Sequence, residues 1–213
     1  FWSISGVPYG TEFYTVDLLK TLLNEGNAKT QDEWIEFRKE AIPKNEFYTG
    51  DMPLQHALFT TLYKLRDDTV KKDEVETIKE FVKKPMFERW LATTTRIMYQ
   101  PSGSLDDVII HNKGMSDECS VREELVFPDE YVKDSTRPSN YKALLGSDNL
   151  EEIQNVYQWL TEKNAYLWRV NSRTNEVQER VAWFYAGSDG ARFGCVRGPS
   201  GRNASLGVRL RRA

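Results

Sequence analysis

The residues that could do acid-base, nucleophilic or metal chemistry are few in this chain. Its only histidines are His56 and His111, and its only cysteines are Cys119 and Cys195. A Ser-His-Asp or Cys-His site would need one of the two histidines as its base. His56 lies inside a predicted helix, where it most simply contacts the core, and His111 ends a predicted strand, where it most simply caps a turn. The sequence therefore predicts no catalytic residue.

The cysteines, carboxylates and glycines give no stronger sign of a cofactor. No CxxC pair or Cys/His spacing suggests zinc, and two distant cysteines favour free thiols over a single long-range disulfide. The carboxylates lie in charged helical runs such as RDDTVKKDEVE, which are typical of a solvated face. The loop GPSGRNAS matches neither the P-loop nor the dinucleotide fingerprint. We therefore expect no metal, no cofactor and no turnover.

Composition and charge narrow the class further. The 213 residues are 39% hydrophobic with a net charge of −3 at pH 7, which is typical of a globular chain with a core. There is no global basic excess, so we expect no nucleic-acid partner despite the six arginines of the tail. No apolar run approaches the roughly 18 residues that a membrane span needs. The start FWSISGVPYG has no basic region of the kind that opens a signal peptide.

Helical spacing dominates the first part of the chain, residues 1–92. Apolar residues in TVDLLKTLLNEG recur at helical intervals and stop at Gly26. Thr30 and Glu33 form a capping box before the apolar face of TQDEWIEFRKEAIP, and Asp51 is placed as the N-cap of MPLQHALFTTLYKLRDD. DEVETIKEFVKK is a more charged segment of the same kind. These patterns predict four helices.

From residue 93 the pattern changes to short β-branched segments separated by turns. TTTRIMYQ, DDVIIHN and SVREELVFP predict strands, and SDECS and DSTRPSN predict exposed loops. One further helix is predicted over 149–163, and four more strands in YLWRVNS, QERVAWFYA, ARFGCVR and SLGVRLRR. The sequence thus predicts an α+β fold in one domain, 1–213, with residues 1–92 mainly helical and 93–213 mostly strands.

The tail, residues 183–213, has an unusual composition. Lys, Glu, Gln, Met and Trp fill 49 of the first 183 positions and none of the last 30. Every residue from Phe184 to Ser205 can be encoded by a triplet that ends in C, and such triplets exclude those five amino acids. The pattern favours a segment whose codons were changed by one process.

Side-chain alternation along ARFGCVRG predicts two unlike faces for this strand. One face, which we expect to meet the core, carries Phe193, Cys195 and Arg197. The other carries Arg192, Gly194, Val196 and Gly198. A glycine in a strand costs roughly 0.5 to 1 kcal/mol. The glycines therefore either serve β-bulges or close backbone approaches, or stand at positions that are free to vary.

The order RF-C-R-PS, then a short free stretch, then LGVR resembles the variable proteins of diversity-generating retroelements, particularly their archaeal and archaeal-virus branch. The stretches TQDEW, EFYTGDMPL and WRVNS are also similar to that branch. In this family an error-prone reverse transcriptase randomises template adenines, so AAC-type codons become any NNC codon and the protein gains a hypervariable surface. The family's fold is a C-type lectin-like domain whose last strands display the variable side chains.

The resemblance implies which tail residues are fixed and which vary. The fixed scaffold would be Phe193, Cys195, Arg197, Pro199, Leu206, Gly207, Val208 and Arg209. Within a variable region 183–205, the ligand-binding positions would be Trp183, Tyr185, Gly187, Asp189, Gly190, Arg192, Gly194, Val196, Gly198, Gly201, Arg202, Asn203 and Ala204. Trp183 would be either the first varied site or an invariant outward aromatic. Because Trp, Tyr and Arg dominate binding hot spots, the expected anchors are Trp183, Tyr185, Arg192 and Arg202.

The function that the resemblance implies is recognition of a receptor or other target by diversified residues on a rigid C-type lectin-like scaffold with an N-terminal helical elaboration. We expect the target to be a protein rather than a small molecule, met on a virion or cell surface. One alternative is a non-variable structural or interaction protein of a virus or mobile element. A formylglycine-generating-type oxidase shares the fold, but it would need Cys119 and Cys195 as a reactive pair. Calcium-dependent sugar binding would need an EPN or WND cluster, which the sequence lacks.

Overall fold

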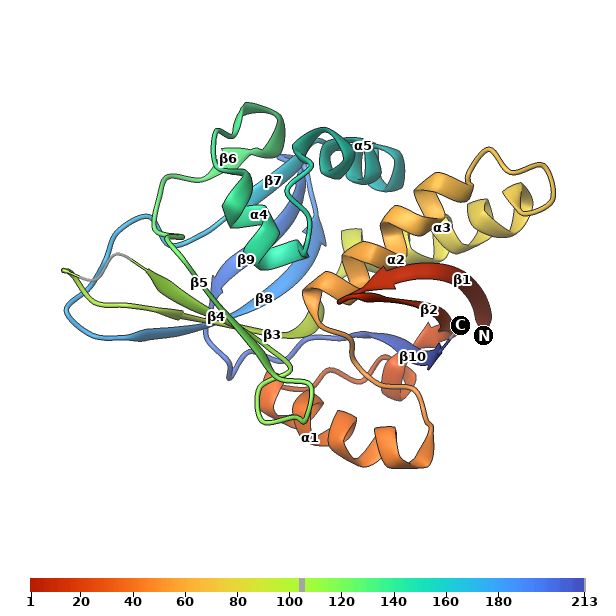
Figure 1. The fold of residues 1–213 in the computed structure, drawn as a ribbon, viewed down its shortest axis with the longest axis horizontal. Helices are drawn as coiled ribbons and strands as arrows, with labels where there is room; N and C mark the ends of the chain where they lie inside the picture. Colours follow the sequence, from red (N-terminus) through yellow and green to blue (C-terminus); the bar gives the residue numbers. More distant parts are fainter. Residues whose placement is uncertain (104–105, 213) are drawn as a thin grey trace.

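The computed structural model describes residues 1–103 and 106–212 of the chain. It is an α+β fold in which helices pack against two β-sheets (Figure 1). The helices are α1 Gln31–Ala41, α2 Met52–Leu65, α3 Lys72–Glu88, α4 Pro138–Leu145 and α5 Leu150–Thr161. Short 3₁₀ turns span Leu23–Gly26, Ile42–Lys44 and Val132–Asp134.

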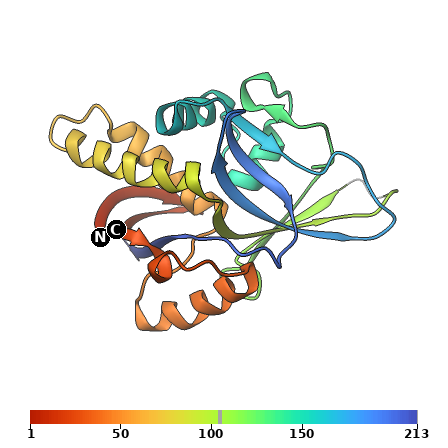
Figure 2. The ribbon, with the colours of Figure 1, turned by 180° about the vertical axis from the view of Figure 1, so that it is seen from behind.

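The smaller sheet joins the two ends of the chain. Its three antiparallel strands have the order β1–β2–β10, with bounds Trp2–Tyr9, Glu12–Leu22 and Leu206–Arg212. The N- and C-termini accordingly lie side by side in both ribbon views (Figures 1 and 2). Asp17 in β2 is fully buried and accepts hydrogen bonds from Arg209 at 2.8 Å and Arg211 at 2.7 Å. This carboxylate fastens the last strand to the first hairpin.

The larger sheet has the strand order β5–β4–β3–β8–β9–β7–β6. Its strands are β3 Leu91–Tyr99, β4 Asp107–His111, β5 Cys119–Glu123, β6 Glu130–Tyr131, β7 Ala165–Trp168, β8 Gln178–Ala186 and β9 Ala191–Arg197. All neighbouring strands are antiparallel except β7 and β9, which are parallel. The sheet curls, with α5 over its strands β7 and β9 and α4 against β5 (Figure 1).

Aromatic side chains form the centre of the core between this sheet and the helices. Phe193 in β9 lies against Tyr157 in α5, with ring centroids 4.6 Å apart. Phe184 in β8 lies against Phe59 in α2, at 5.7 Å. All four side chains are fully buried. The same hydrophobic cluster continues through β2 and β10 of the smaller sheet, so β8 and β9 are backed by packed side chains along their inner face.

The predicted helix at TVDLLKTLLNEG is wrong, because residues 12–22 form strand β2. Val16 and Leu18 are fully buried in the middle strand of the smaller sheet, with partners from both chain ends. The other three predicted N-terminal helices are confirmed as α1, α2 and α3. Thr30 and Glu33 form the capping box of α1, and Asp51 caps α2.

The second part of the chain follows the predicted strands closely, and the helix predicted over 149–163 is confirmed as α5. The segment DSTRPSN, predicted as a loop, instead runs into α4, which begins at Pro138. This helix ends where Gly146 adopts φ 77°. A proline in the first turn and a left-handed glycine just past the end are both recognised helix boundaries.

Candidate ligand-binding surface

The outer face of β7, β9 and β8 carries a group of aromatic and basic side chains. Antiparallel pairing places Trp183 opposite Gly194 and Tyr185 opposite Arg192. Parallel pairing places Trp168 beside Gly194 on the other side. Because neighbouring residues of a strand point to opposite faces, these five positions share the face turned away from the core.

Trp183 is the centre of this aromatic cluster. Trp90, which precedes β3, stacks on it with ring centroids 4.3 Å apart and an interplanar angle of 7°. Trp168 meets it edge-on at 5.8 Å and 87°. Trp183 points away from the core but is fully buried by these neighbours, so the expectation of a ligand-binding anchor at this position is wrong.

The Trp183 indole packs directly against the backbone of Gly194. A Cβ built at Gly194 would lie 2.0 Å from Cζ2 of Trp183 and 2.2 Å from two further ring atoms. No side chain fits there unless the indole moves. The hypothesis of a close backbone approach is therefore confirmed for this glycine, and its expected role as a freely variable display position is wrong.

Arg192 lies over two aromatic rings of the same face. Its guanidinium carbon is 5.1 Å from the ring centroid of Trp168 and 5.6 Å from that of Tyr185, both within the range of cation–π attraction. It also forms an ion pair with Asp189 in the β8–β9 turn. Beside it lies a cavity of about 240 Å³, lined by Asp129, Tyr166, Trp168, Asp189 and Arg192.

A β-bulge changes the face on which Arg197 emerges. Trp183 pairs with Gly194, but Val181, two residues earlier, pairs with Arg197, three residues later. The extra residue in β9 reverses the alternation beyond Cys195. Arg197 is accordingly exposed, with its guanidinium over the ring of Trp90. The prediction that Arg197 shares the core face of Phe193 and Cys195 is therefore wrong.

The loop after β9 returns along the N-terminal end of α1. Asn203 pairs with Lys29 through both backbone hydrogen bonds, and its carbonyl accepts a 2.9 Å hydrogen bond from the Trp34 indole. The exposed side chain of Arg202 bonds to Glu33 at 3.0 Å. The loop is thus anchored by its backbone, while the side chain of Arg202 faces outwards.

The thirteen positions expected to bind ligand divide into two groups. Nine are exposed or partly exposed: Tyr185, Gly187, Asp189, Arg192, Val196, Gly198, Gly201, Arg202 and Asn203. Four are buried: Trp183, Gly190, Gly194 and Ala204. A Cβ at Gly190 would lie 2.8 Å from the carbonyl oxygen of Asn164, and the Ala204 carbonyl accepts a 2.7 Å hydrogen bond from the backbone of Ala92. The expectation that these four display side chains to a ligand is wrong.

Three aromatic residues of this surface lie outside the tail and were missed by sequence reasoning. Trp90 precedes β3, and Tyr166 and Trp168 flank the buried Leu167 in β7. The alternation in YLW was a usable signal for two outward rings. The parallel pairing of β7 with β9, which brings them to the tail, joins segments that local pattern does not connect.

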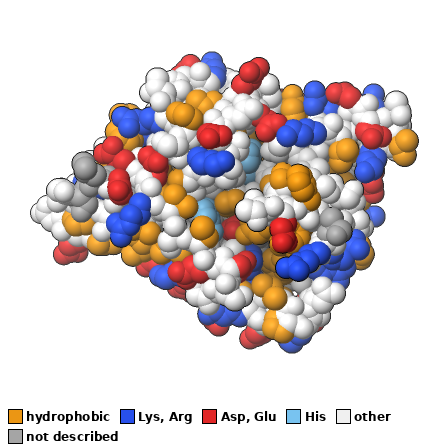
Figure 3. Space-filling model, in the orientation of Figure 1, with side chains coloured by type: hydrophobic (Ala, Val, Ile, Leu, Met, Phe, Trp, Pro, Cys, Tyr) orange, Lys and Arg blue, Asp and Glu red, His pale blue; other side chains and the backbone are white. Residues whose placement is uncertain are grey.

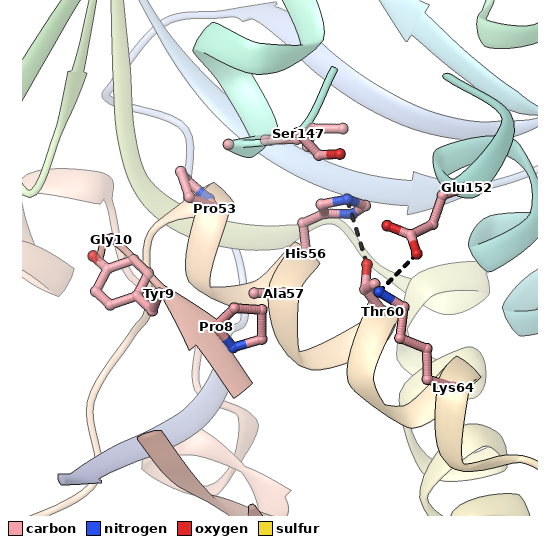
Figure 4. A pocket seen from close by; sticks show the side chains of 12 residues that line it. Pro8, Tyr9, Gly10, Pro53, His56, Ala57, Thr60, Lys64, Ser147 and Glu152 are labelled. Atoms are coloured by element: carbon pink, nitrogen blue, oxygen red, sulfur yellow. Dashed lines mark hydrogen bonds and ion pairs between the residues drawn. The ribbon is translucent and has the colours of Figure 1, made fainter. Parts of the chain in front are cut away.

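A separate cleft of about 240 Å³ lies between the β1–β2 turn, α2 and the segment after α4, and its lining includes Tyr9, His56, Lys64, Ser147 and Glu152 (Figure 4). A hollow with pale-blue histidine atoms in it is visible on this face in Figure 3. Burial lowers the pKa of His56 to about 3, so the imidazole is neutral at pH 7. Lys64 is already paired with Glu152 at 2.7 Å.

The immediate partners of His56 are hydroxyl groups. Nδ1 lies 3.2 Å from the Tyr157 hydroxyl and Nε2 lies 3.5 Å from Thr60 Oγ1. The ring is 2% exposed and stacks on Tyr157. The interpretation of His56 as a helix residue that contacts the core is confirmed.

His111 and the cysteines also have structural surroundings. His111 Nε2 donates to the Ala143 carbonyl at 2.9 Å, and Nδ1 accepts from Thr95 Oγ1 at 2.9 Å, so this side chain joins β3 to α4 instead of capping a turn. Cys119 and Cys195 are both free, as expected. Burial raises the pKa of Cys195 to about 12. Within residues 1–103 and 106–212 there is no group of three or more His, Cys, Asp or Glu side chains that could hold a metal ion.

Comparison of the chain with protein-family models, with curated proteins and with solved structures finds no match. No helix in the described part of the chain is both long enough and apolar enough to span a membrane.

Proposed function

We propose that this chain is a variable ligand-binding protein of the diversity-generating retroelement kind, with a C-type lectin-like scaffold that displays diversified side chains. The observation that carries the proposal is the exposure of most of the positions that the resemblance implies to be variable, within the segment that the codon pattern marks. Nine of the thirteen proposed variable positions reach the surface, whereas Phe193, Cys195, Leu206, Gly207 and Val208 of the proposed fixed set are buried. Selection for folding would hold these five buried residues, and mutagenesis would change the nine exposed positions.

The geometry supports a binding role because the exposed positions lie on a rigid support. The inner face of β8 and β9 is held by the contact of Phe184 with α2 and by that of Phe193 with α5. Substitutions at surface positions away from special features usually change the free energy of unfolding by less than about 0.5 kcal/mol. A frame of this kind tolerates new side chains in the way that antibody frameworks tolerate new loops.

The surface supports a protein target more than a small molecule. The proposed contact positions run from the β8–β9 turn at Asp189, along β9, to the loop at Arg202. The cavity beside Arg192 is about 240 Å³, whereas pockets that enclose drug-sized ligands are usually about 300 to 1,000 Å³. A broad surface with Tyr and Arg near its centre matches the composition of protein-binding hot spots. A virion or cell surface would be the setting for such a contact.

A role without turnover is part of the proposal. The His56 ring is bonded to hydroxyl groups, His111 is bonded between Thr95 and a backbone carbonyl, and neither ring is oriented by a carboxylate as in a catalytic triad. Cys195 is buried in β9 and Cys119 lies on β5. Strands β4, β3 and β8 separate them, which argues against the reactive cysteine pair of an oxidase.

The DNA downstream of the gene tests the proposal. We expect a near-copy of the 3′ end of the gene that differs only at adenines, close to a reverse transcriptase gene. The differences should fall in codons of the nine exposed positions and spare that of Phe193. A downstream region without such a copy, or a copy with differences spread over all four bases, would overturn the proposal in favour of a non-variable structural or interaction protein.

A further inference from the structure

Four layers are stacked on the outer face of the larger sheet. The backbone of Gly194 forms the lowest layer, the Trp183 indole lies on it, and Trp90 lies parallel to Trp183. The guanidinium of Arg197 lies over Trp90 as the outermost layer. The two inner layers are held by packing, because Trp183 is fully buried and Trp168 supports its edge. Arg197 therefore lies over a ring that is stacked on packed layers, although its own side chain is exposed.

Arg197 differs from the other arginines of the tail in its charge partners. Arg192 pairs with Asp189, Arg202 with Glu33, Arg209 and Arg211 with Asp17, and Arg212 with Glu12. Arg197 has no carboxylate within salt-bridge distance among residues 1–103 and 106–212, and its guanidinium lies over the ring of Trp90. Its pKa is lowered by partial burial alone, so no neighbouring anion offsets the cost of its charge. Its N–H groups are open to an external acceptor.

We infer that Arg197 binds a carboxylate of the target protein and is a fixed anchor among the variable side chains. The inference rests on the proposed function, and it adds the chemistry of one contact that all copies of the protein would share. A guanidinium offers a flat fork of N–H donors that matches the two oxygens of a carboxylate. Contact with the Trp90 ring limits the positions that the guanidinium can take before the ligand arrives, which reduces the conformational entropy lost on binding.

A single carboxylate fits this position better than a polyanion. The chain carries a net charge of −3, so its overall field repels nucleic acid. Arg202, the nearest exposed arginine along the loop, is already neutralised by Glu33. One unpaired guanidinium next to aromatic rings is the arrangement expected for an Asp or Glu side chain within a mixed protein surface.

The carboxylate contact can be tested without knowledge of the target. Protein with ¹⁵N-labelled arginine is titrated with N-acetyl-Glu-Glu-amide, with N-acetyl-Gln-Gln-amide and with inorganic phosphate, at constant ionic strength. Arg197→Lys assigns the Arg197 Nε–Hε resonance. The internal control is Arg122, which is exposed on the edge strand β5 and is separated from β9 by strands β4, β3 and β8.

We expect the Arg197 resonance to move saturably with the glutamate peptide, at least threefold more than the Arg122 resonance, and to stay in place with the glutamine peptide. Equal shifts at Arg197 and Arg122, no shift at Arg197, or equal shifts with the two peptides would overturn the inference. A response to phosphate without a response to the glutamate peptide would also overturn it, and would point to a phosphorylated ligand.

A selection experiment separates this anchor from the proposed function. A displayed random-peptide library is panned against the unmodified protein, Arg197→Gln and Arg122→Gln, after thermal melts have shown that all three are folded. We expect peptides enriched by the unmodified protein and Arg122→Gln to contain at least twofold more Asp and Glu than those enriched by Arg197→Gln. Equal acidic content would overturn the anchor. Enrichment by none of the proteins would count against the proposed binding function, while the titration would still decide the carboxylate contact.

Discussion

Gly194 lies directly beneath the indole of Trp183, in a space that a single methyl group would overfill, since a Cβ there would be 2.0 Å from Cζ2. The two residues are paired across β8 and β9, and each determines what the other can be. Both stood among the expected binding positions, and both are buried. Trp183 and Gly194 therefore form one packing unit, in which the indole packs on the glycine backbone and neither residue is displayed to a ligand.

This packing unit predicts strong coupling between the two positions. Gly194→Ala should lower the free energy of unfolding by about 1 to 3 kcal/mol through overpacking, and Trp183→Ala by about 3 to 5 kcal/mol through loss of the buried ring. In the double variant the methyl group enters space that the ring has left, so the combined loss should be smaller than the sum by about 0.5 to 3 kcal/mol. Urea denaturation of the four proteins measures the difference, and strict additivity would contradict the packing described here.

The exposed positions should tolerate joint replacement. Changing Val196, Gly198, Gly201 and Arg202 together to serine should cost little stability, because surface substitutions usually change it by less than about 0.5 kcal/mol each. A Cβ at Gly198 would meet nothing within 4 Å. Phe193→Ala should cost about 3 to 5 kcal/mol, since this fully buried ring packs on Tyr157. Thermal melts compare the two proteins, and a fourfold variant that melts as low as Phe193→Ala would show that these positions are structural.

The burial of His56 predicts an acid-dependent loss of stability. Its pKa is about 3 in the folded chain because of burial, against about 6.5 when unfolded. Below pH 6.5 the unfolded chain therefore takes up a proton that the folded chain takes up only near pH 3, and the free energy of unfolding falls as the pH falls through this window. His56→Gln should reduce the slope by up to about 1.4 kcal/mol per pH unit.

His111, whose pKa burial also lowers, is retained in both proteins, so the comparison isolates His56. Urea midpoints measured at half-unit steps from pH 7 to pH 4 provide the two slopes. Identical slopes would mean that the imidazole of His56 is accessible to protons in the folded chain.

The two thiols should differ sharply in reactivity. Cys119 is exposed on β5, whereas Cys195 is fully buried and burial raises its pKa to about 12. Because the thiolate is the reactive form, N-ethylmaleimide at pH 7 should modify Cys119 alone in the folded protein and both thiols in 6 M guanidinium chloride. Intact mass before and after digestion locates the label, with Cys119→Ser as the control that should stay unlabelled when folded. Rapid labelling of Cys195 would show that β9 opens readily.

The local sequence pattern was enough to predict the helices that begin at a recognisable capping residue. The capping box at Thr30 and the cap at Asp51 were visible before the fold was known, and both are present. The prediction of a helix in TVDLLKTLLNEG, residues 15–26, is wrong because Leu18, Leu19 and Leu22 fit helical spacing, while the strand partners of residues 15–22 lie in segments 2–9 and 206–212. The contribution of those distant partners to the burial of Val16 and Leu18 cannot be read from an eleven-residue window.

The sequence predicted which segment forms the candidate surface, but it did not predict the direction and burial of every side chain in it. Here too, the missing information lies in contacts between segments that are distant in the sequence. Codon pattern located the segment, and alternation placed Phe193 and Cys195 inwards, as observed. Alternation then failed at Arg197 because the bulge depends on how β8 pairs with β9. The burial of Trp183 depends on Trp90, a residue 93 positions away. Contacts of this kind are properties of the assembled sheet.

The bulge in β9 makes the number of residues in the strand, and not their chemical identity, the quantity that determines which side chains face outwards. Substitution at Val196 leaves that number unchanged, so Arg197 keeps its place over Trp90. Removal of the one residue between Cys195 and Arg197 would eliminate the bulge and leave Arg197 opposite Val181 on the outer face, whereas plain alternation over the present number of residues would turn the guanidinium towards the core. A process that exchanges bases without inserting or deleting them keeps the number of residues in β9 constant. It can therefore change the exposed side chains while each position of the strand keeps its inward or outward direction.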